Sequence, residues 1–468
     1  MRPQILITAI ILARCWLATA LPGIAQESSP ELVSSFELPS ESAGEAPAED
    51  PPWAAEIAAL RERIDELETA ADEQEQTEQA AKAEKAKEPE INWTAELQAD
   101  FYAFNQDDAS RLSVGDIENG EAFRRARIGM WGHYGPSEYR IEMDFAQEGR
   151  PSFLDVYAGL NDLPLLGRVR VGHFLEPFSL DRVQSNRYLT FMERGLPSQA
   201  FSPGRNMGIM ANNTWLEEDG TWGIGLFRTE SDEFGDAQGD GTDSAITSRV
   251  TCLPWYDSSC PDSRYLHVGM SGSARDAADD TVRFQAQPEA QLGSTFPNVP
   301  FFVDTGFIPA ETFMLLGLEA AIVDGPFSVQ AECFHVPVDS ISLGSLGFDG
   351  WYVQSTYFLT GEHRPYLRES GVFTRLHPYR DFLRYAGDDD NYLVRGPGAW
   401  EVAVRVSHLD LNDGDIRGGE LTDFTVGLNW YLSPYMRVTS NYVHAFLDDS
   451  NGLESGTDIF AVRLGYEF

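Results

Sequence analysis

The stretch between Ala122 and Asn212 decides the fold of this chain. It begins AFRRARIGMWGHYG (122–135), continues through EYRIEMDFAQEGRPSFLDVYAGL (138–160) and RVRVGHFLEPFSLDRVQSNRYLTFMERG (168–195), and ends with FSPGRNMGIM (201–210). Within 139–145 the apolar residues Tyr139, Ile141, Met143 and Phe145 alternate with Arg140, Glu142 and Asp144. A strand with one apolar and one charged face needs two solvents, which lipid outside and water inside a β-barrel provide. For these strands alone, a half-exposed sheet of a soluble protein is the alternative.

The first 90 residues have a different character. Residues 1–25 have the features of a secretory signal peptide, because Arg2 precedes an apolar run and small residues follow it at 23–25. Residues 26–90 read as an acidic linker that contains a short helix at 53–88. In that helix, apolar residues recur at spacings of three and four, namely Ile57, Leu60, Ile64, Leu67 and Ala71. This seam predicts a short coiled coil that joins protomers or contacts the cell wall, and a solvated helix without a partner is the alternative.

Residues 91–468 consist of alternating segments in close succession. Segments with period two begin near residues 93, 122, 138, 153, 168, 206, 221, 264, 282, 311, 327, 350, 400, 421, 436 and 457. The boundaries within 264–300 and 362–399 are poorly defined. The pattern predicts an all-β fold, an antiparallel transmembrane barrel of about 16 strands. No later segment has about 20 consecutive apolar residues, so no transmembrane helix is expected.

The connections between these segments alternate in length. Gly135–Ser137, Asp324–Pro326 and 433–434 are tight turns, whereas 105–121, 176–205, 231–263 and 447–456 are long. This asymmetry is typical of bacterial outer-membrane barrels, so the bacterial outer membrane and its lipid are the expected surroundings. The segment 176–205 mixes apolar and charged residues. A loop surrounded by water has little use for so many apolar groups, so we expect this loop to fold into the barrel.

Composition and motifs exclude several kinds of function. The net charge of −40 argues against binding of nucleic acid. We find no G-x-S-x-G motif and no grouping of Ser, His and Asp that alternation would bring together, so no catalytic residues are predicted. No Cys/His spacing suits a metal, and we expect no cofactor. Cys252 and Cys260 flank LPWYDSS inside the predicted loop 231–263, and in an exported protein they are expected to form a disulfide.

Several motifs, seen together and in order, resemble a known family. They include AFRRARIGMWG, FLDVYAGL, VGHFLEPFSL with SNRYLTFMERG, GLEAAIVDGPFSVQAE, GWYVQSTYFLTGE, GAWEVAVRVSHLDL and the final VRLGYEF. The stretch 91–468 is similar to the phosphate- and pyrophosphate-selective porins O and P of bacterial outer membranes. The resemblance implies a homotrimer of 16-stranded barrels, each with a pore narrowed by inward loops, through which small anions or other small hydrophilic solutes diffuse.

The resemblance also implies a set of pore-lining residues. Arg124 and Arg125 match the family's pair of constriction arginines, Arg187 stands at the position of a lysine, and Asp155 matches a nearby acid. By alternation and by position in the loop, we add Arg127, Arg140 and Arg194 as candidates for anion binding. Guanidinium groups suit this role because they present a planar fork of donors.

Other features depart from the family. Glu96 stands where a basic residue is expected, and acidic residues outnumber arginines in 91–468. Arginines and acids that neutralise one another on neighbouring strands are the alternative to an anion site. A non-selective or cation-preferring general porin therefore remains open. So does a structural envelope tether whose barrel is plugged.

Overall fold

The computed structural model describes residues 88–468, except 147–149, 230–231, 233, 236–242, 258–262, 294–297 and 387–391. Before residue 88 it describes only Ala59, Arg63, Ile64, Leu67 and Thr69, which are helical. The chain divides into two units, Met1–Gln76 and Thr77–Phe468. The predicted signal peptide and most of 26–90 lie outside the described residues. Among the residues that are described, no helix has the length and apolar composition needed to cross a bilayer.

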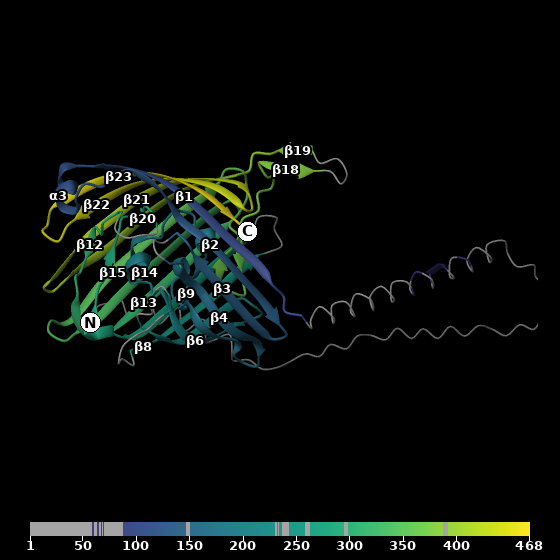
Figure 1. Ribbon diagram of the computed structural model, residues 1–468, viewed down its shortest axis with the longest axis horizontal. Helices are drawn as coiled ribbons and strands as arrows, with labels where there is room; N and C mark the ends of the chain where they lie inside the picture. Colours follow the sequence, from purple (N-terminus) through teal and green to yellow (C-terminus); the bar gives the residue numbers. More distant parts are fainter. Residues whose placement is uncertain are drawn as a thin grey trace, which may run out of the picture. The chain divides into compact units, whose positions relative to one another are not determined.

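Antiparallel strands form a closed barrel of 16 strands, as predicted (Figure 1). They are β1 (Asn92–Gln106), β2 (Gly120–Tyr134), β3 (Ser137–Asp144), β4 (Ser152–Leu163), β5 (Gly167–Leu175), β6 (Arg205–Trp215), β7 (Gly220–Arg228), β8 (Ser244–Asp257), β9 (Arg264–Asp276), β13 (Ile308–Asp324), β14 (Phe327–Ser340), β15 (Gly344–Phe358), β20 (Ala399–Asp413), β21 (Ile416–Ser433), β22 (Met436–Asp448) and β23 (Glu454–Glu467). Each strand pairs with the next. The pairing of β23 with β1, from Glu96↔Glu467 to Gln106↔Thr457, closes the barrel.

Short elements occupy the connections between these strands. The helices are α3 (Asp108–Val114), α4 (Leu180–Val183) and α5 (Leu196–Phe201), with 3-10 turns η2 (Asn186–Tyr188) and η3 (Ala278–Asp280). The short strands are β10 (Thr281–Val282), β11 (Gln285–Ala286), β12 (Val303–Asp304), β16 (Tyr366–Leu367), β17 (Val372–Phe373), β18 (Leu383–Ala386) and β19 (Tyr392–Arg395).

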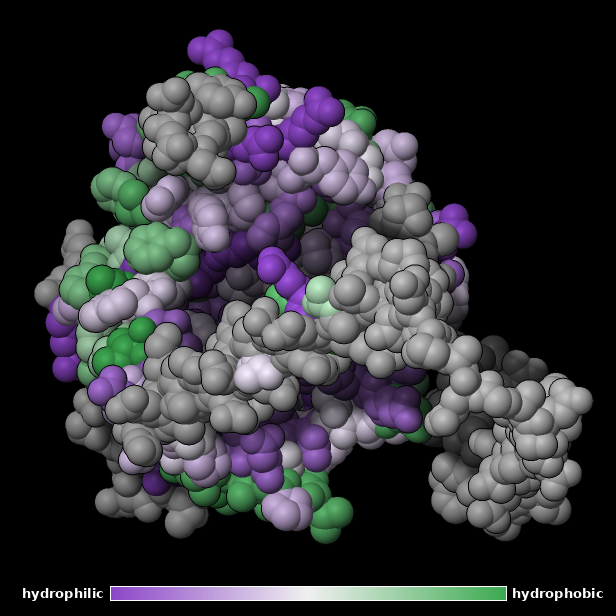
Figure 2. Space-filling model, turned by 90° about the vertical axis from the view of Figure 1, so that its right-hand side faces the viewer, coloured by the Kyte–Doolittle hydropathy of each residue, from purple (hydrophilic) through white to green (hydrophobic). Residues whose placement is uncertain are grey.

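The alternation in sequence becomes an alternation between the two faces of the wall. In β20 the outward residues Val402, Val404 and Val406 are exposed, whereas the residues that follow each of them are buried inside the barrel: Ala403, Arg405 and Ser407. An exposed valine is stable on this surface because lipid replaces water as its solvent. Figure 2 views the end of the barrel where the C-terminus lies, and hydrophilic residues surround a hollow there.

The strand number agrees with the prediction, but two of the predicted segments were wrong. The predicted loop 231–263 contains a full barrel strand, β8, whose inward residues Thr247, Arg249 and Thr251 are polar. The segment near Val282 does alternate, but it forms only the two-residue β10 and a stretch packed inside the barrel. Alternation arises wherever one face of an extended chain meets a core, so it does not by itself identify a strand of the wall.

The presence of β8 also changes the setting of the predicted disulfide. Cys252 lies in β8 and not in a loop. Cys260 lies outside the described residues, so its pairing with Cys252 remains a prediction.

Three connections fold into the barrel. We call residues 176–204 the inner loop. The second comprises 283–293 and 298–307, and the third is 362–376, which belongs to the long connection 359–398 between β15 and β20. That connection lies at the same end as the tight turn between β2 and β3, which departs from the expected asymmetry of lengths (Figure 1). A core inside the barrel joins the inner segments to the wall and includes Phe178, Leu196, Phe201, Phe284, Phe302, Phe348 and Leu409.

Candidate channel constriction

The inner loop is fixed to one side of the barrel by hydrogen bonds of its backbone. The amides of Leu180 and Asp181 donate to the carboxylate of Glu332 on β14, at 3.1 and 2.7 Å. Further along the loop, Leu196 N–H donates to Ser407 Oγ, and the carbonyls of Leu189 and Thr190 accept from Arg437 and Asn429. The apolar residues Phe178, Leu180, Phe191 and Met192 are buried. The prediction that this loop folds into the barrel is therefore confirmed.

Glu193 also attaches the inner loop to the wall, close to the seam where β23 pairs with β1 and closes the barrel. Its carboxylate accepts from Arg124 at 3.0 and 3.1 Å and from Arg463 at 2.8 Å. Burial by itself raises the pKa of the Glu193 carboxyl, but the charges of Arg124 and Arg463 outweigh burial and hold that pKa well below its usual range. The carboxylate thus stays ionised as an anchor of the loop.

A cavity of about 200 Å³ separates the inner loop from the opposite wall, β1 to β6. Its charged lining residues are Arg127, Arg140, Arg182, Arg187, Arg194 and Arg205, with Glu96, Glu142 and Asp155. We call it the arginine cavity. Six arginines and three carboxylates thus line this cavity, in a chain whose net charge is −40.

Each carboxylate of the arginine cavity lies between two arginines. Glu96 is 3.2 Å from Arg127 and 3.5 Å from Arg187. Glu142 is 2.7 Å from Arg140 and 3.2 Å from Arg187. Asp155 accepts from Arg205 at 2.9 Å and lies 3.8 Å from Arg140. Two carboxylates outside the lining also contact these arginines: Asp144 lies 2.7 Å from Arg127, and Glu467 lies 3.9 Å from Arg187. The carboxylates therefore position the guanidinium groups and neutralise part of their charge.

Two arginines of the cavity are held by carbonyl groups. Arg194 donates to the carbonyls of Asp181, Gln184 and Arg182, and Arg182 Nε donates to the carbonyl of Pro203 at 2.9 Å. Among the described residues, neither guanidinium has a carboxylate within 4.0 Å. Carbonyl dipoles orient a cation without cancelling its charge, so these two side chains supply positive charge to the cavity.

Arg124 and Arg125 do not line the arginine cavity. The pairs Gln98↔Arg125 and Ala99↔Phe123 leave Arg124 as the extra residue of a β-bulge. The bulge lets Arg124 and Arg125 both point inward, whereas strict alternation would place only one of them inside the barrel. Arg125 donates to Gln98, and Arg124 joins Glu193 of the inner loop to Gln291 of the second inner segment. Arg124 therefore fixes the loop to the wall, whereas Arg125 joins β2 to β1.

The other candidates from the sequence do meet in this cavity: Arg127, Arg140, Asp155, Arg187 and Arg194. Sequence reasoning did not select Arg182 and Arg205. Arg205 is the first residue of β6 and follows Pro203-Gly204, where the chain returns from the inner loop to the wall. A basic residue at this return point was the signal available in the sequence.

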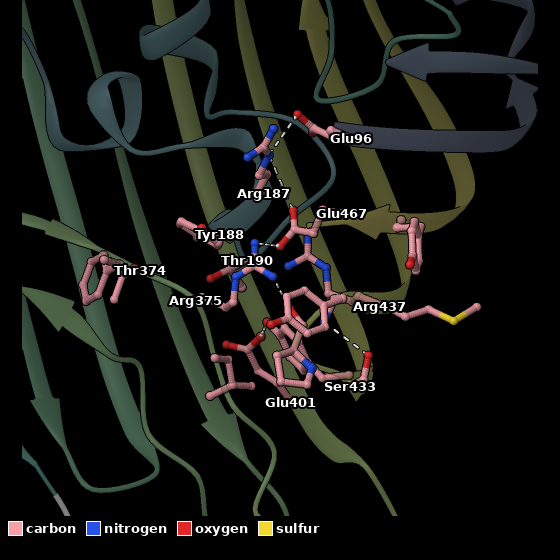
Figure 3. Close-up of a pocket in the computed structure, with 18 of the residues that line it drawn as sticks. Glu96, Arg187, Tyr188, Thr190, Thr374, Arg375, Glu401, Ser433, Arg437 and Glu467 are labelled. Carbon is pink, nitrogen blue, oxygen red and sulfur yellow. Dashed lines mark hydrogen bonds and ion pairs between the residues drawn. The ribbon is translucent and has the colours of Figure 1, made fainter. Parts of the chain in front are cut away.

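Arg187 also faces a second cavity, shown in Figure 3. There the carboxylate of Glu467 lies 3.9 Å from Arg187 and 3.6 Å from Arg375 of the third inner segment. Arg437 also lines this second cavity and donates to the carbonyl of Leu189. Arg187 thus connects the arginine cavity with the end of the barrel where β23 terminates.

A closed barrel of 16 antiparallel strands, with apolar residues outside and a charged cavity beside an inward loop, defines a porin-type channel. Residues 91–468 match the family described as "Phosphate-selective porin O and P", and the chain belongs to this family. Its place is therefore the bacterial outer membrane, as a channel and not an enzyme.

Two relatives in sequence and one solved structure are similar to this chain. Porin O of Pseudomonas aeruginosa is 27% identical over 413 residues, covering 80% of this chain and 87% of that protein. An uncharacterized protein of Caulobacter vibrioides is 27% identical over 332 residues, covering 69% of this chain and 62% of that protein. The fold is similar to that of a loop L8 deletion mutant of OmpT, an outer membrane protein of Vibrio cholerae. The TM-score is 0.50 at 12% identity, over 81% of this chain and 99% of that one.

Proposed function

We propose that this porin is a passive channel for small hydrophilic solutes that prefers anions at the arginine cavity, and that it works as a homotrimer. The six arginines that line this cavity carry the proposal, because two of them, Arg182 and Arg194, have no carboxylate within 4.0 Å among the described residues. At about 4 Å, two unit charges interact by roughly 4 kcal/mol near a protein surface, so even partial pairing leaves an attractive field for a passing anion. Arg182 and Arg194 contribute most directly, because carbonyl groups hold them.

The same geometry limits the strength of the preference. Arg127, Arg140, Arg187 and Arg205 all contact carboxylates of the cavity. A phosphate ion must compete with these carboxylates for guanidinium donors. We therefore expect a modest anion preference and weak phosphate block of the chloride current.

The test is the reversal potential of the purified channel in a planar bilayer that separates two KCl concentrations. The wild type should give a reversal potential with the sign expected of a channel that prefers chloride to potassium. Arg182→Gln with Arg187→Gln should move it toward the potassium value, because two of the six cavity arginines lose their charge. Arg264→Gln, on an exposed ion pair with Asp324, is the matched control and should change nothing.

The alternatives give different results in the same measurement. A potential near zero, or of the potassium sign, in the wild type would contradict the anion preference and favour a general porin. The three inner segments make a plugged tether worth testing as the second candidate. Absence of any conductance from correctly folded protein would favour it.

A further inference from the structure

A third cavity adjoins the arginine cavity, and its chemistry differs. Its volume is about 360 Å³, within the range of roughly 300–1,000 Å³ typical of small-molecule sites. It lies between the wall from β3 to β8, the inner loop and the third inner segment. The two cavities share the lining residues Arg140, Asp155, Leu175, Val183 and Ser185. A solute bound in one can therefore extend into the other.

About half of the residues that line this larger cavity are apolar or aromatic, and the others include Arg168, Arg170 and Arg249. Tyr157 and Met210 come from the wall, Val183 and Tyr188 from the inner loop, and Val372 from the third inner segment. A hydrated chloride or phosphate ion gains nothing from the apolar part of this lining. A solute with an apolar body gains free energy there, because its body and the lining leave water together.

Arg170 places a positive charge among the rings of the larger cavity. Its guanidinium lies 5.1 Å from the ring centre of Tyr157 and 5.4 Å from that of Phe174. It donates to Asn212 at 3.3 Å, and its Nε is buried with no hydrogen-bond partner among the described residues. No described carboxylate forms an ion pair with it. The apolar lining is thus combined with a cation that has a spare donor.

We propose that the arginine cavity and the larger cavity together bind organic anions that carry an apolar body about the size of one ring. The anionic group lies among the arginines, and the body lies against Tyr157, Tyr188 and Val183. This inference rests on the proposed function, because the solute must enter an open, anion-preferring channel. It adds the class of solute that the channel takes best.

Benzenesulfonate and methanesulfonate provide the test, because they share one permanently ionised group and differ only in the apolar body. Each is added to a wild-type channel carrying KCl current in a planar bilayer, and the concentration that halves the current is measured. We expect benzenesulfonate to act at a concentration at least tenfold lower, which corresponds to about 1.4 kcal/mol. Equal concentrations would overturn the inference.

Variants on two sides of the larger cavity locate the effect. Tyr157→Ser on the wall and Tyr188→Ser on the inner loop should each remove most of the difference between the two sulfonates. Tyr357→Ser is the matched control, because this exposed ring lies on the outward face of β15, and the full difference should remain. An unchanged difference in both cavity variants would contradict the site. If one variant fails to fold, the other still decides.

The reversal potential of the same wild-type channel separates the two proposals. A potential without anion preference refutes the proposed function and this inference with it. An anion-preferring potential combined with equal block by both sulfonates refutes this inference alone.

Discussion

At the scale of single residues, the seam of the barrel depends on one buried guanidinium. Arg463 on β23 donates to Asp100 of β1 at 2.7 and 2.6 Å, and to Glu193 of the inner loop at 2.8 Å. All three side chains are buried. Arg463 therefore joins the first strand, the last strand and the loop. Removal of Arg463 leaves Asp100 buried without a compensating charge and leaves Glu193 with Arg124 alone.

We expect Arg463→Met to lower the free energy of unfolding by about 3–5 kcal/mol, because Asp100 and Glu193 lose their shared partner. Urea unfolding in detergent micelles, followed by the shift in gel mobility between folded and unfolded barrel, measures the change. Arg264→Met is the control: this arginine lies 2.6 Å from Asp324, but both side chains are exposed. Exposed pairs contribute about 0–1 kcal/mol, so equal losses in the two variants would contradict the role given to the seam.

At the scale of elements, the inner loop owes its position to contacts with distant strands. The first turn of α4 presents two amides to Glu332, which also accepts from the hydroxyl of Tyr352 at 2.6 Å. The helix has only four residues and gains little from its own hydrogen bonds. Its attachment to the wall therefore decides whether the loop stays inside the barrel.

Glu332→Ala should loosen the inner loop, because two buried amides lose their acceptor at about 1–3 kcal/mol each. We expect the wild-type loop to resist protease added to folded channels, and the variant to be cleaved within 176–204. The single-channel current of the variant should also become noisier. Glu311→Ala, at an exposed position of β13, serves as the control. Rapid cleavage of the wild type would show that the loop does not stay inside.

At the scale of the whole molecule, net charge does not report the charge of the pore. The chain carries −40, yet six arginines and only three carboxylates line the arginine cavity. A solute inside the barrel responds mainly to nearby groups, because the Debye length at physiological salt is only about 8 Å. The selectivity of a porin is thus set by a few residues at its constriction.

The proposed homotrimer is a prediction at this same scale. Purified protein in mild detergent should have three times the mass of one chain by light scattering. Deletion of residues 53–88 distinguishes two origins: trimers that persist are held by barrel walls, whereas trimers that dissociate need the predicted coiled coil. A monomer in every detergent that preserves the folded barrel would contradict the trimer.

The sequence by itself determined the barrel and its inward loop. Alternation with period two is local, so it is readable wherever the two faces of a strand meet different solvents. The apolar residues of the inner loop indicated that this loop is buried, and this signal is also local to the sequence. Alternation failed at β8, where Ser248 lies on the outward face and the apolar Ala245 and Leu253 lie on the inward face. It also failed at Val282, where an inner segment mimicked a strand of the wall.

Only the tertiary structure decided which arginines meet. The bulge at Arg124 breaks the alternation, and pairing with β1 reveals it. Arg182 and Arg205 join the cavity because the loop folds back across the barrel, and Glu193 meets Arg463 across 270 residues of sequence. Such contacts depend on strand order and loop path, which no short pattern encodes. The fold follows from local periodicity, whereas the charge of the pore follows from long-range packing.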